Sequence, residues 1–471
     1  MKFWNRTILI AQSEVWMCGK GLVECQVQPM AHIAPFRALR YDPARVDLAN
    51  VVTQPYDKIT PEMQERYYAA SPHNLVRIIL GKREAKDDTG ANTYTRAAAY
   101  FRDWRRQGVF LQEAQPSIYG YAQHFTVPGG SEELERRGFI ALGQLEDYSD
   151  GVVFRHEQTL AKPKADRLDL LRATRAHFGQ LFMLYSDAAG EIDGLLAAAA
   201  AAPEIETRDE YGVRHQVSKI SDPSLVDLVR SKMRDKKLII ADGHHRYETA
   251  LNYRNERRST ADTAPPWGAR GFSSEIPPYE MVMMTFVNMD SPGLLILPTH
   301  RVVHGLAAFR AEGLRQKASE FFSVEEADPS VDAVRASGIL REAGRSGTAL
   351  MAVTGDRVFL LDTPKSPGSN LSGLSIRQRS LDVVQLHKYL LEGVLGISEA
   401  AIRDQQNISY VRDAGEAMAR VRSGGANVAF LMNPVRMRQV RDIAFAGEVL
   451  PQKSTDFYPK LLSGLTIYAL E

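Results

Sequence analysis

Short apolar runs alternate with amphipathic stretches along most of the chain. Runs of four to eight apolar residues favour buried strands, and apolar positions spaced by three or four residues favour helices. This pattern predicts helices over 93–107, over 165–176 and from 243 to near 258, and strands over 75–80, 117–125, 138–145, 180–185, 237–241, 279–289 and 294–297. Such alternation is typical of α/β or α+β architecture, with mixed sheets flanked by helices.

The pattern also divides the chain. Residues 1–29 are predicted to be an N-terminal extension outside the fold, or alternatively to add an edge strand over 22–28. Residues 30–304 form the first predicted α/β domain and contain the Asp242–Arg246 turn described below. Residues 305–471 form the second α/β domain, and we expect its C-terminal loop to close the functional site at that turn. Thr60-Pro61 is a typical helix start, the alanine run 197–202 continues a helix, and 259–278 has the composition of a long loop.

The predicted strand 237–241 is followed directly by residues that could carry chemistry. It runs into Asp242-Gly243-His244-His245-Arg246, where the last predicted long helix of this domain begins. We expect Asp242 to cap that helix and Gly243 to allow a ligand close to the backbone. A helix N-terminus attracts anions, so this turn is a predicted phosphate site. The alternative is a capped helix with one buried histidine bonded to backbone.

Three further polar clusters accompany this turn. The first surrounds His156 and Glu157 and continues into a basic helix, which is either a solvated, salt-bridged face or a phosphate site. The second cluster follows the predicted strand 294–297, and ligand sites are common at the ends of such strands. The third cluster is the polar loop 450–460. The predicted phosphate-binding residues of these clusters are Lys164, Arg167, Arg172, His300, Arg301 and Lys453.

Composition limits the kinds of partner, cellular location and cofactor that the sequence supports. The chain has 471 residues with 58 basic and 57 acidic side chains, so net charge gives no argument for nucleic-acid binding. No apolar run approaches the roughly 18 residues of a membrane span. The two cysteines, both before residue 30, fit a reducing cytoplasm, which is the expected location. Neither a phosphate-loop motif nor a dinucleotide turn occurs, so no haem, flavin or nicotinamide cofactor is indicated.

Taken together, these clusters resemble an uncharacterised bacterial family, number 1015 in the domain-of-unknown-function series. The resemblance runs from Met30 to near Glu471, and the family has no settled activity to carry over. The segments that carry it include Pro35–Tyr41, Gln54–Asp57, Arg155–Leu160, Pro163–Leu168, Leu170–Thr174, Ala241–Ala250, Leu297–Arg301 and Pro451–Thr455.

A more distant likeness adds chemistry. Gly243-His-His-Arg-Tyr-Glu248 is similar to the nucleotide-binding turn of the partition-protein-B/sulfiredoxin superfamily, which includes kinases of free serine. This likeness implies a related N-terminal core, with Gly243 and Arg246 facing phosphates. Sulfiredoxin has its catalytic cysteine where this chain has His244, and no cysteine follows residue 25, so sulfinic-acid repair is excluded. Glu248 stands where partition proteins carry basic charge.

The leading hypothesis is a nucleotide-binding phosphotransferase acting on a small hydroxylated metabolite, possibly an amino acid such as serine. Phosphoryl transfer needs charge neutralisation and a base near the attacking hydroxyl. Glu157 or Asp242 is expected to act as that base or to hold Mg²⁺ through water, and His244 or His245 to carry the proton. Mg²⁺ arrives mainly with the nucleotide. The catalytic candidates are His156, Glu157, Asp242, His244 and His245.

Two other classes remain open. One is a metal-dependent hydrolase or lyase using His156, His244 and Glu248. The other is a nucleotide-sensing, partition-like regulator that binds DNA. Substrate, nucleotide and oligomeric state are not predicted.

Overall fold

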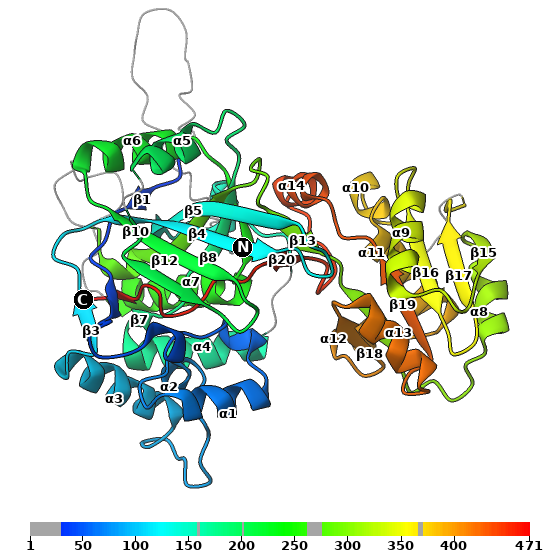
Figure 1. Cartoon of the computed structure of the whole chain (residues 1–471), viewed down its shortest axis with the longest axis horizontal. Coiled ribbons are helices and arrows are strands. Elements are labelled where there is room, and N and C mark those ends of the chain that lie inside the picture. The colour runs from blue at the N-terminus through cyan, green and yellow to red at the C-terminus, as the bar shows by residue number, and fades with distance from the viewer. Residues whose placement is uncertain (1–29, 158–160, 200–201, 261–275, 366–370) are drawn as a thin grey trace, which may run out of the picture.

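The computed structural model describes residues 30–157, 161–199, 202–260, 276–365 and 371–471. The predictions for 1–29, for the end of the alanine run and for most of the loop 259–278 lie outside these residues. Figure 1 shows two bodies side by side, each built on its own sheet. The α/β prediction is confirmed.

The larger body contains a nine-stranded mixed sheet. Parallel pairs join β11 to β6 and β12 to β8, while the other pairs are antiparallel. In spatial order its strands are β6 (Val153–Phe154), β11 (Leu238–Asp242), β8 (Leu181–Tyr185), β12 (Met281–Asn288), β5 (Glu133–Gln144), β4 (Ile118–Thr126), β10 (Arg214–Ile220) and β9 (Ile205–Arg208), with β1 (Ile33–Ala34) beside β5.

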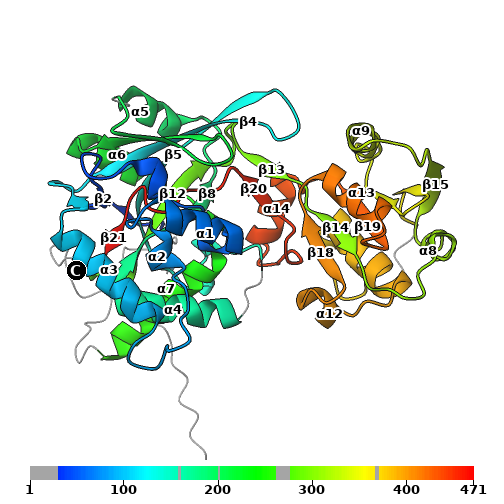
Figure 2. The same cartoon turned by 60° about the horizontal axis from the view of Figure 1, so that its bottom comes forward.

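Helices cover one face of this sheet. Apolar side chains of α5 (Glu191–Ala199), α6 (Pro223–Met233) and α7 (His244–Thr260) pack on alternate residues of β8, β11 and β12. Against α7 lies α4 (Ala161–Thr174), followed by α3 (Thr93–Arg106), α2 (Val76–Ile79) and α1 (Pro61–Ala70). Figure 2 shows these last five helices grouped together.

The smaller body has a six-stranded antiparallel sheet between helices. Its strands, in order, are β15 (Ser323–Ala327), β17 (Val358–Asp362), β16 (Ala349–Val353), β19 (Val428–Met432), β14 (His300–Val303) and β18 (Ile408–Val411). Its helices are α8 (Ala311–Ala318), α9 (Ala333–Ala343), α10 (Ile376–Arg379), α11 (Asp382–Gln385), a π-helix (Leu386–Val394), α12 (Glu399–Arg403), α13 (Ala414–Arg422) and α14 (Met437–Phe445).

The C-terminal segment returns to the larger body. Each of its two strands completes a small antiparallel ladder with a strand from before residue 305, and a third such ladder lies near the N-terminus. These pairs are β20 (Asp456–Tyr458) with β13 (Leu295–Leu297), β21 (Tyr468–Ala469) with β7 (Ala176–His177), and β2 (Leu39–Tyr41) with β3 (Phe110–Gln112). β13 and β20 lie at the junction of the bodies in both views. The division into two domains at residue 305 stays a prediction. The C-terminal strands β20 and β21 pair with strands from before that residue.

Two local predictions are wrong. Leu75–Leu80, predicted as a strand, contains the short helix α2, because a short, mostly apolar segment suits a buried helix as well as a strand. Asp242 does not cap α7: it is the last residue of β11, and Gly243 occupies the capping position. The other strands named above and the helices over 93–107, 165–176 and after 243 are confirmed within a few residues at each end. In the described part of the chain, no helix has the length and apolar character needed to cross a membrane.

Candidate functional site

The turn between β11 and α7 is built around a glycine. Gly243 has φ +98°, a backbone region that side chains other than glycine rarely adopt. A Cβ there would lie 2.9 Å from Leu181 and 3.1 Å from the guanidinium of Arg246. The glycine therefore lets the start of α7 approach β8 while Arg246 folds back over the turn.

Ion pairs hold this turn. The guanidinium of Arg246 donates to Asp242 at 2.6 Å, and Nζ of Lys460 lies 3.5 Å from the same carboxylate and 3.0 Å from Asp456. Arg412 donates to Asp456 at 2.6 Å. Burial opposes charge on both acids, but the cations outweigh it: they hold the pKa of Asp242 far below its usual range and that of Asp456 at about 2. Burial also opposes charge on Lys460, yet the two carboxylates raise its pKa.

Two histidines brace the turn from inside. His156 Nδ1 donates to the carbonyl of Ile240 at 2.8 Å, so its Nε2 accepts from the hydroxyl of Thr455, also at 2.8 Å. The backbone N–H of His156 donates to Nε2 of His244 at 3.4 Å. Burial lowers the pKa of His156 to about 4 and that of His244 well below its usual range. Both rings are therefore neutral at pH 7 and serve the framework of the turn.

Glu157 faces the same turn in a different electrostatic setting. Its carboxylate accepts from the backbone N–H of Lys453, in the loop 450–455. Burial raises the pKa of Glu157, although Lys453 partly opposes this. Behind the loop, the guanidinium of Arg301 donates to the carbonyl of Lys453 at 3.2 Å. A residue of the smaller body thus supports a loop that contacts Glu157.

A further segment of the site, residues 56–58, is not among the predicted site residues. Tyr56, Asp57 and Lys58 form a short 3₁₀ helix before α1. Burial lowers the pKa of Lys58, and Lys460 lowers it further. Asp57 lies near enough to His245 to oppose the fall in pKa that burial causes there. Gln54–Asp57 is one of the segments that carry the family resemblance, but no local sequence signal links Asp57 to His244 at the start of α7, 187 residues later.

The structure brings most of the predicted residues together, but not all. Asp242, Gly243, His244, His245, Arg246, His156, Glu157 and Lys453 share the turn and its neighbouring loop. Lys164 pairs with Glu248 one turn along α7, at 2.8 Å.

The remaining predicted residues do other things. Arg167 is engaged by Asp166 and by the carbonyl of Ile79. Arg172 is exposed and pairs with Glu256 and Asp169, which makes it part of a solvated face. His300 lies in β14, where Nδ1 accepts from the backbone N–H of Met432 at 3.2 Å.

The metal trio does not assemble. Both ring nitrogens of His156 are engaged, and Glu248 pairs with Lys164 and Arg155. Within the described ranges, no group of three or more His, Cys, Asp or Glu side chains is arranged to hold a metal ion.

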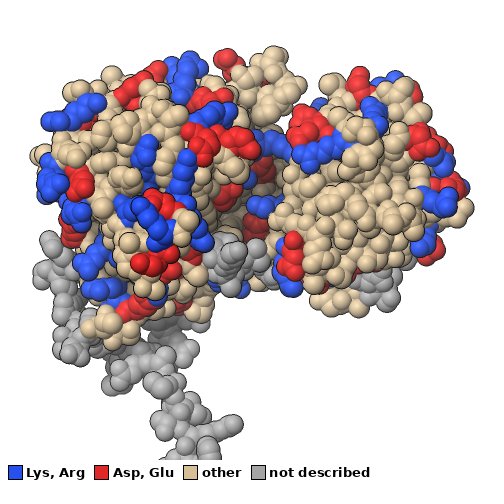
Figure 3. Space-filling model, turned by 90° about the horizontal axis from the view of Figure 1, so that it is seen from below, with Lys and Arg blue, Asp and Glu red and all other residues tan. Residues whose placement is uncertain are grey.

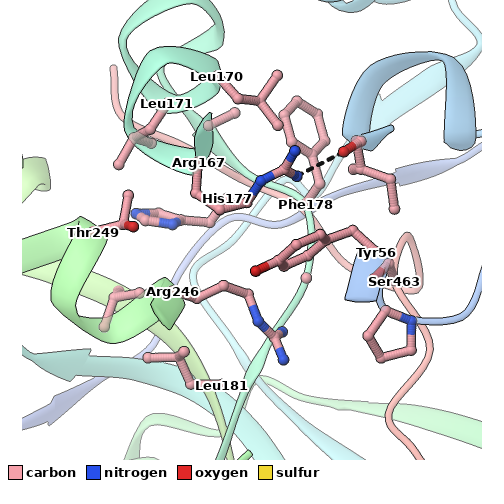
Figure 4. A pocket seen from close by; sticks show the side chains of 15 residues that line it. Tyr56, Arg167, Leu170, Leu171, His177, Phe178, Leu181, Arg246, Thr249 and Ser463 are labelled. Atoms are coloured by element: carbon pink, nitrogen blue, oxygen red, sulfur yellow. Dashed lines mark hydrogen bonds between the residues drawn. The ribbon is translucent and has the colours of Figure 1, made fainter. Parts of the chain in front are cut away.

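A cavity of about 70 Å³ borders the side chain of Arg246. Figure 4 shows Tyr56, Arg167, His177 and Arg246 around it. The cleft between the two bodies, visible in Figure 3, carries both basic and acidic side chains.

Comparison with protein families supports the family resemblance that the sequence motifs indicate. Residues 33–384 match the model of a family described as a protein of unknown function, DUF1015. The chain belongs to this family. The match covers the 54–58 segment, the turn at 242–246 and Arg301, while the loop 450–460 lies beyond it. No curated protein matches the chain significantly.

Solved structures overlap with it only partially. A conserved hypothetical protein from Pyrococcus furiosus has a TM-score of 0.35 and 11% identity, over 70% of this chain and 95% of its own. A free serine kinase in complex with AMP has a TM-score of 0.34 and 13% identity, over 69% and 91%. SbnI with a C-terminal truncation, from Staphylococcus aureus, has 0.32 and 11%, over 70% and 87%. At these scores, function has to be argued from this chain's own residues.

Proposed function

We propose that the protein transfers a phosphoryl group between a nucleotide and a small hydroxylated metabolite, possibly a free amino acid such as serine. The observation that carries this proposal is the arrangement at the start of α7, where Lys58, Arg246 and Lys460 converge from three distant segments of the chain. The likeness of this turn to the partition-protein-B/sulfiredoxin superfamily belongs to the same proposal.

The start of α7 suits phosphates. The dipole at the N-terminal end of a helix favours an anion there, and Lys460 stays charged in a buried position. Lys460 lies 3.5 Å from Asp242, beyond a short hydrogen bond, so it can contact a phosphate oxygen without leaving Asp456.

The carboxylates divide between two roles. Asp242 is held ionised by its cations and is a poor proton acceptor, whereas the raised pKa of Glu157 suits a general base. The acceptor oxygen attacks the terminal phosphorus, its proton passes to Glu157, and the bond to the bridging oxygen breaks with release of the shortened nucleotide. His245, half-buried beside Asp57, remains the candidate to carry that proton onward.

Mg²⁺ enters this proposal only with the nucleotide. The carboxylates of Asp242 and Asp456 are already engaged by Arg246, Lys460 and Arg412, so these residues do not fit a dedicated protein site. An ion that keeps most of its waters and is bound by phosphates needs no such site.

The test measures binding and turnover separately. Purified protein is screened by thermal shift against ATP, ADP, CTP and GTP with Mg²⁺, and then assayed for phosphoryl transfer to hydroxylated metabolites that include serine. A ligand at about 100 times its Kd adds roughly 2.7 kcal/mol of stability. We expect a shift with wild type that Arg246→Ala and Lys460→Met lose.

Arg172→Ala is the matched control, because Arg172 is an exposed arginine on α4 paired with Glu256. It should keep the full shift. If no nucleotide stabilises the wild-type protein, the proposal is wrong.

A further inference from the structure

The cavity beside Arg246 has a distinctive lining. It is lined by Tyr56, by residues of α4 and α7, by the segment 176–181 and by Ser463. About 10–15 Å³ accommodates one water by the same measure, so about 70 Å³ is room for several atoms of a ligand. Arg246 lines the cavity, and its guanidinium also donates to Asp242, the last residue of β11.

Most of the wall is apolar or aromatic. Leu170, Leu171, Phe178 and Leu181 line the cavity, together with the ring of Tyr56. Such walls exclude water and favour a flat ring over a strongly hydrated group.

Besides Arg246, one other charged side chain lines the cavity, Arg167, and its hydrogen bonds are already made within the protein. Arg167 donates to Asp166 and to the carbonyl of Ile79, and its guanidinium lies 4.1 Å from the centre of the Tyr56 ring. Its charge is therefore neutralised within the protein, which argues against a second anion site here.

The lining also holds four uncharged polar groups, of which the Thr249 hydroxyl donates to the carbonyl of Lys164 at 3.4 Å. The other three are the Tyr56 hydroxyl, the His177 ring and the Ser463 hydroxyl. Among the described residues, none of these side chains has a hydrogen-bond partner. Burial lowers the pKa of His177 to about 4, so its neutral ring has one donor and one acceptor. The hydroxyls likewise donate or accept, which matches the mixed edge of a heteroaromatic ring.

We propose that this cavity binds the base of a nucleotide whose phosphates lie at the start of α7, with Arg246 between the two parts. This rests on the proposed function and extends it: the phosphoryl donor or acceptor is a nucleotide recognised through its base, and inorganic polyphosphate is a poor substitute. Tyr56, His177 and Ser463 are the residues that contact the base.

Titration calorimetry with ADP and with inorganic pyrophosphate separates the two halves of the site. Wild-type protein should bind ADP at least tenfold more tightly than pyrophosphate. Tyr56→Phe and His177→Phe each keep an aromatic wall but lose a hydrogen bond, so ADP affinity should fall by about three- to tenfold. Pyrophosphate affinity should not change.

Matched controls make the same changes elsewhere. Tyr279→Phe, before β12, and His124→Phe, in β4, lie outside the cavity lining and should leave both affinities as in wild type. If wild type binds ADP and pyrophosphate equally, or if neither cavity variant weakens ADP, the base site is disproved while the phosphate site stands. If wild type binds neither ligand, the proposed function fails with it.

Discussion

The acids of the site are distinguished by which cations face them, not by depth of burial alone. Asp242 has Arg246 and Lys460 on its two oxygens, whereas Glu157 has a single backbone N–H and a desolvated setting. The same residue chemistry thus gives one lowered and one raised pKa within one turn. From the sequence alone, Glu157 and Asp242 are equally good candidates for the general base, because the closeness of Lys460 to Asp242 cannot be deduced from spacing along the chain.

Glu157→Gln should abolish turnover while leaving nucleotide binding intact. The amide oxygen still accepts from the N–H of Lys453 but takes no proton, so kcat should fall by about 10²–10⁴-fold. For wild type, activity should be present above the raised pKa of Glu157 and be lost as pH falls through it. A kcat–pH profile of both proteins, with ADP affinity measured in parallel, checks this. Unchanged turnover would assign the base elsewhere.

Asp242→Asn should destabilise the fold. Lys460 and Arg246 would keep their charges in a largely buried turn with one ionised partner fewer, which costs about 1–3 kcal/mol. Urea denaturation measures the change in the free energy of unfolding. Asp227→Asn removes the partner of Arg230 on the exposed face of α6 and should change it by less than about 0.5 kcal/mol. Equal effects at both positions would contradict a special role for the Asp242 cluster.

At the scale of elements, periodicity predicted most strands and helices but not the residues at their ends. Leu75–Leu80 shows why: without a long period, an apolar run packs as a helix against α3 as readily as it pairs in a sheet. Asp242 shows the same limit at one residue. Its side chain is drawn to Arg246 and Lys460 instead of the helix N–H groups, a tertiary preference that local capping rules do not contain.

The loop 450–455 depends on an element of the other body. Arg301 in β14 is fully buried and donates to the carbonyls of Gln452 and Lys453, while Lys453 adopts φ +58° and directs its N–H to Glu157. Arg301 is thus a positioning residue. Its position after a predicted strand indicates phosphate binding, but its guanidinium donates to backbone carbonyls and to the sulfur of Met432.

Arg301→Lys should therefore lower kcat and shift the pH profile. A lysine keeps the charge but not the planar donor fork, so the loop should relax and weaken the N–H bond that lowers the pKa of Glu157. The acidic limb of the kcat–pH profile should move to higher pH, with ADP affinity within twofold of wild type. Arg420→Lys, on exposed α13, is the control. A lower kcat with an unmoved acidic limb would reduce Arg301 to a general structural role.

At the scale of the molecule, the site is assembled by chain return. The segments near residues 157 and 243 meet through the pairing of β6 with β11, and the return of the C-terminal strands to the larger body adds the segment near 456. Motif analysis found most of these segments because polar clusters follow apolar strands. It singled out the loop 450–460 but named only Lys453 there as a site residue, not Asp456 or Lys460, and it did not name Lys58. Nothing local marks a lysine whose partner lies in a distant segment of the chain.

The whole molecule should lose stability in mild acid through buried neutral histidines. Burial lowers the pKa of His156, His177 and His300 to about 4. The unfolded chain binds protons near pH 6.5, so below that pH it binds more protons than the native state and stability falls until the native pKa is passed. Each histidine contributes a loss of about 2 kcal/mol between pH 7 and pH 5.

His300→Asn tests this in the smaller body, because an amide oxygen can replace Nδ1 as acceptor from the Met432 N–H and does not titrate. Urea denaturation at pH 7 and pH 5 should show a wild-type loss of several kcal/mol, reduced by about 2 kcal/mol in the variant. One hydrophobic core cluster includes residues of both bodies, so the change in one sheet should appear in the unfolding of the whole chain. An equal pH dependence in both proteins would show that His300 protonates without cost in the native state, against its burial in β14.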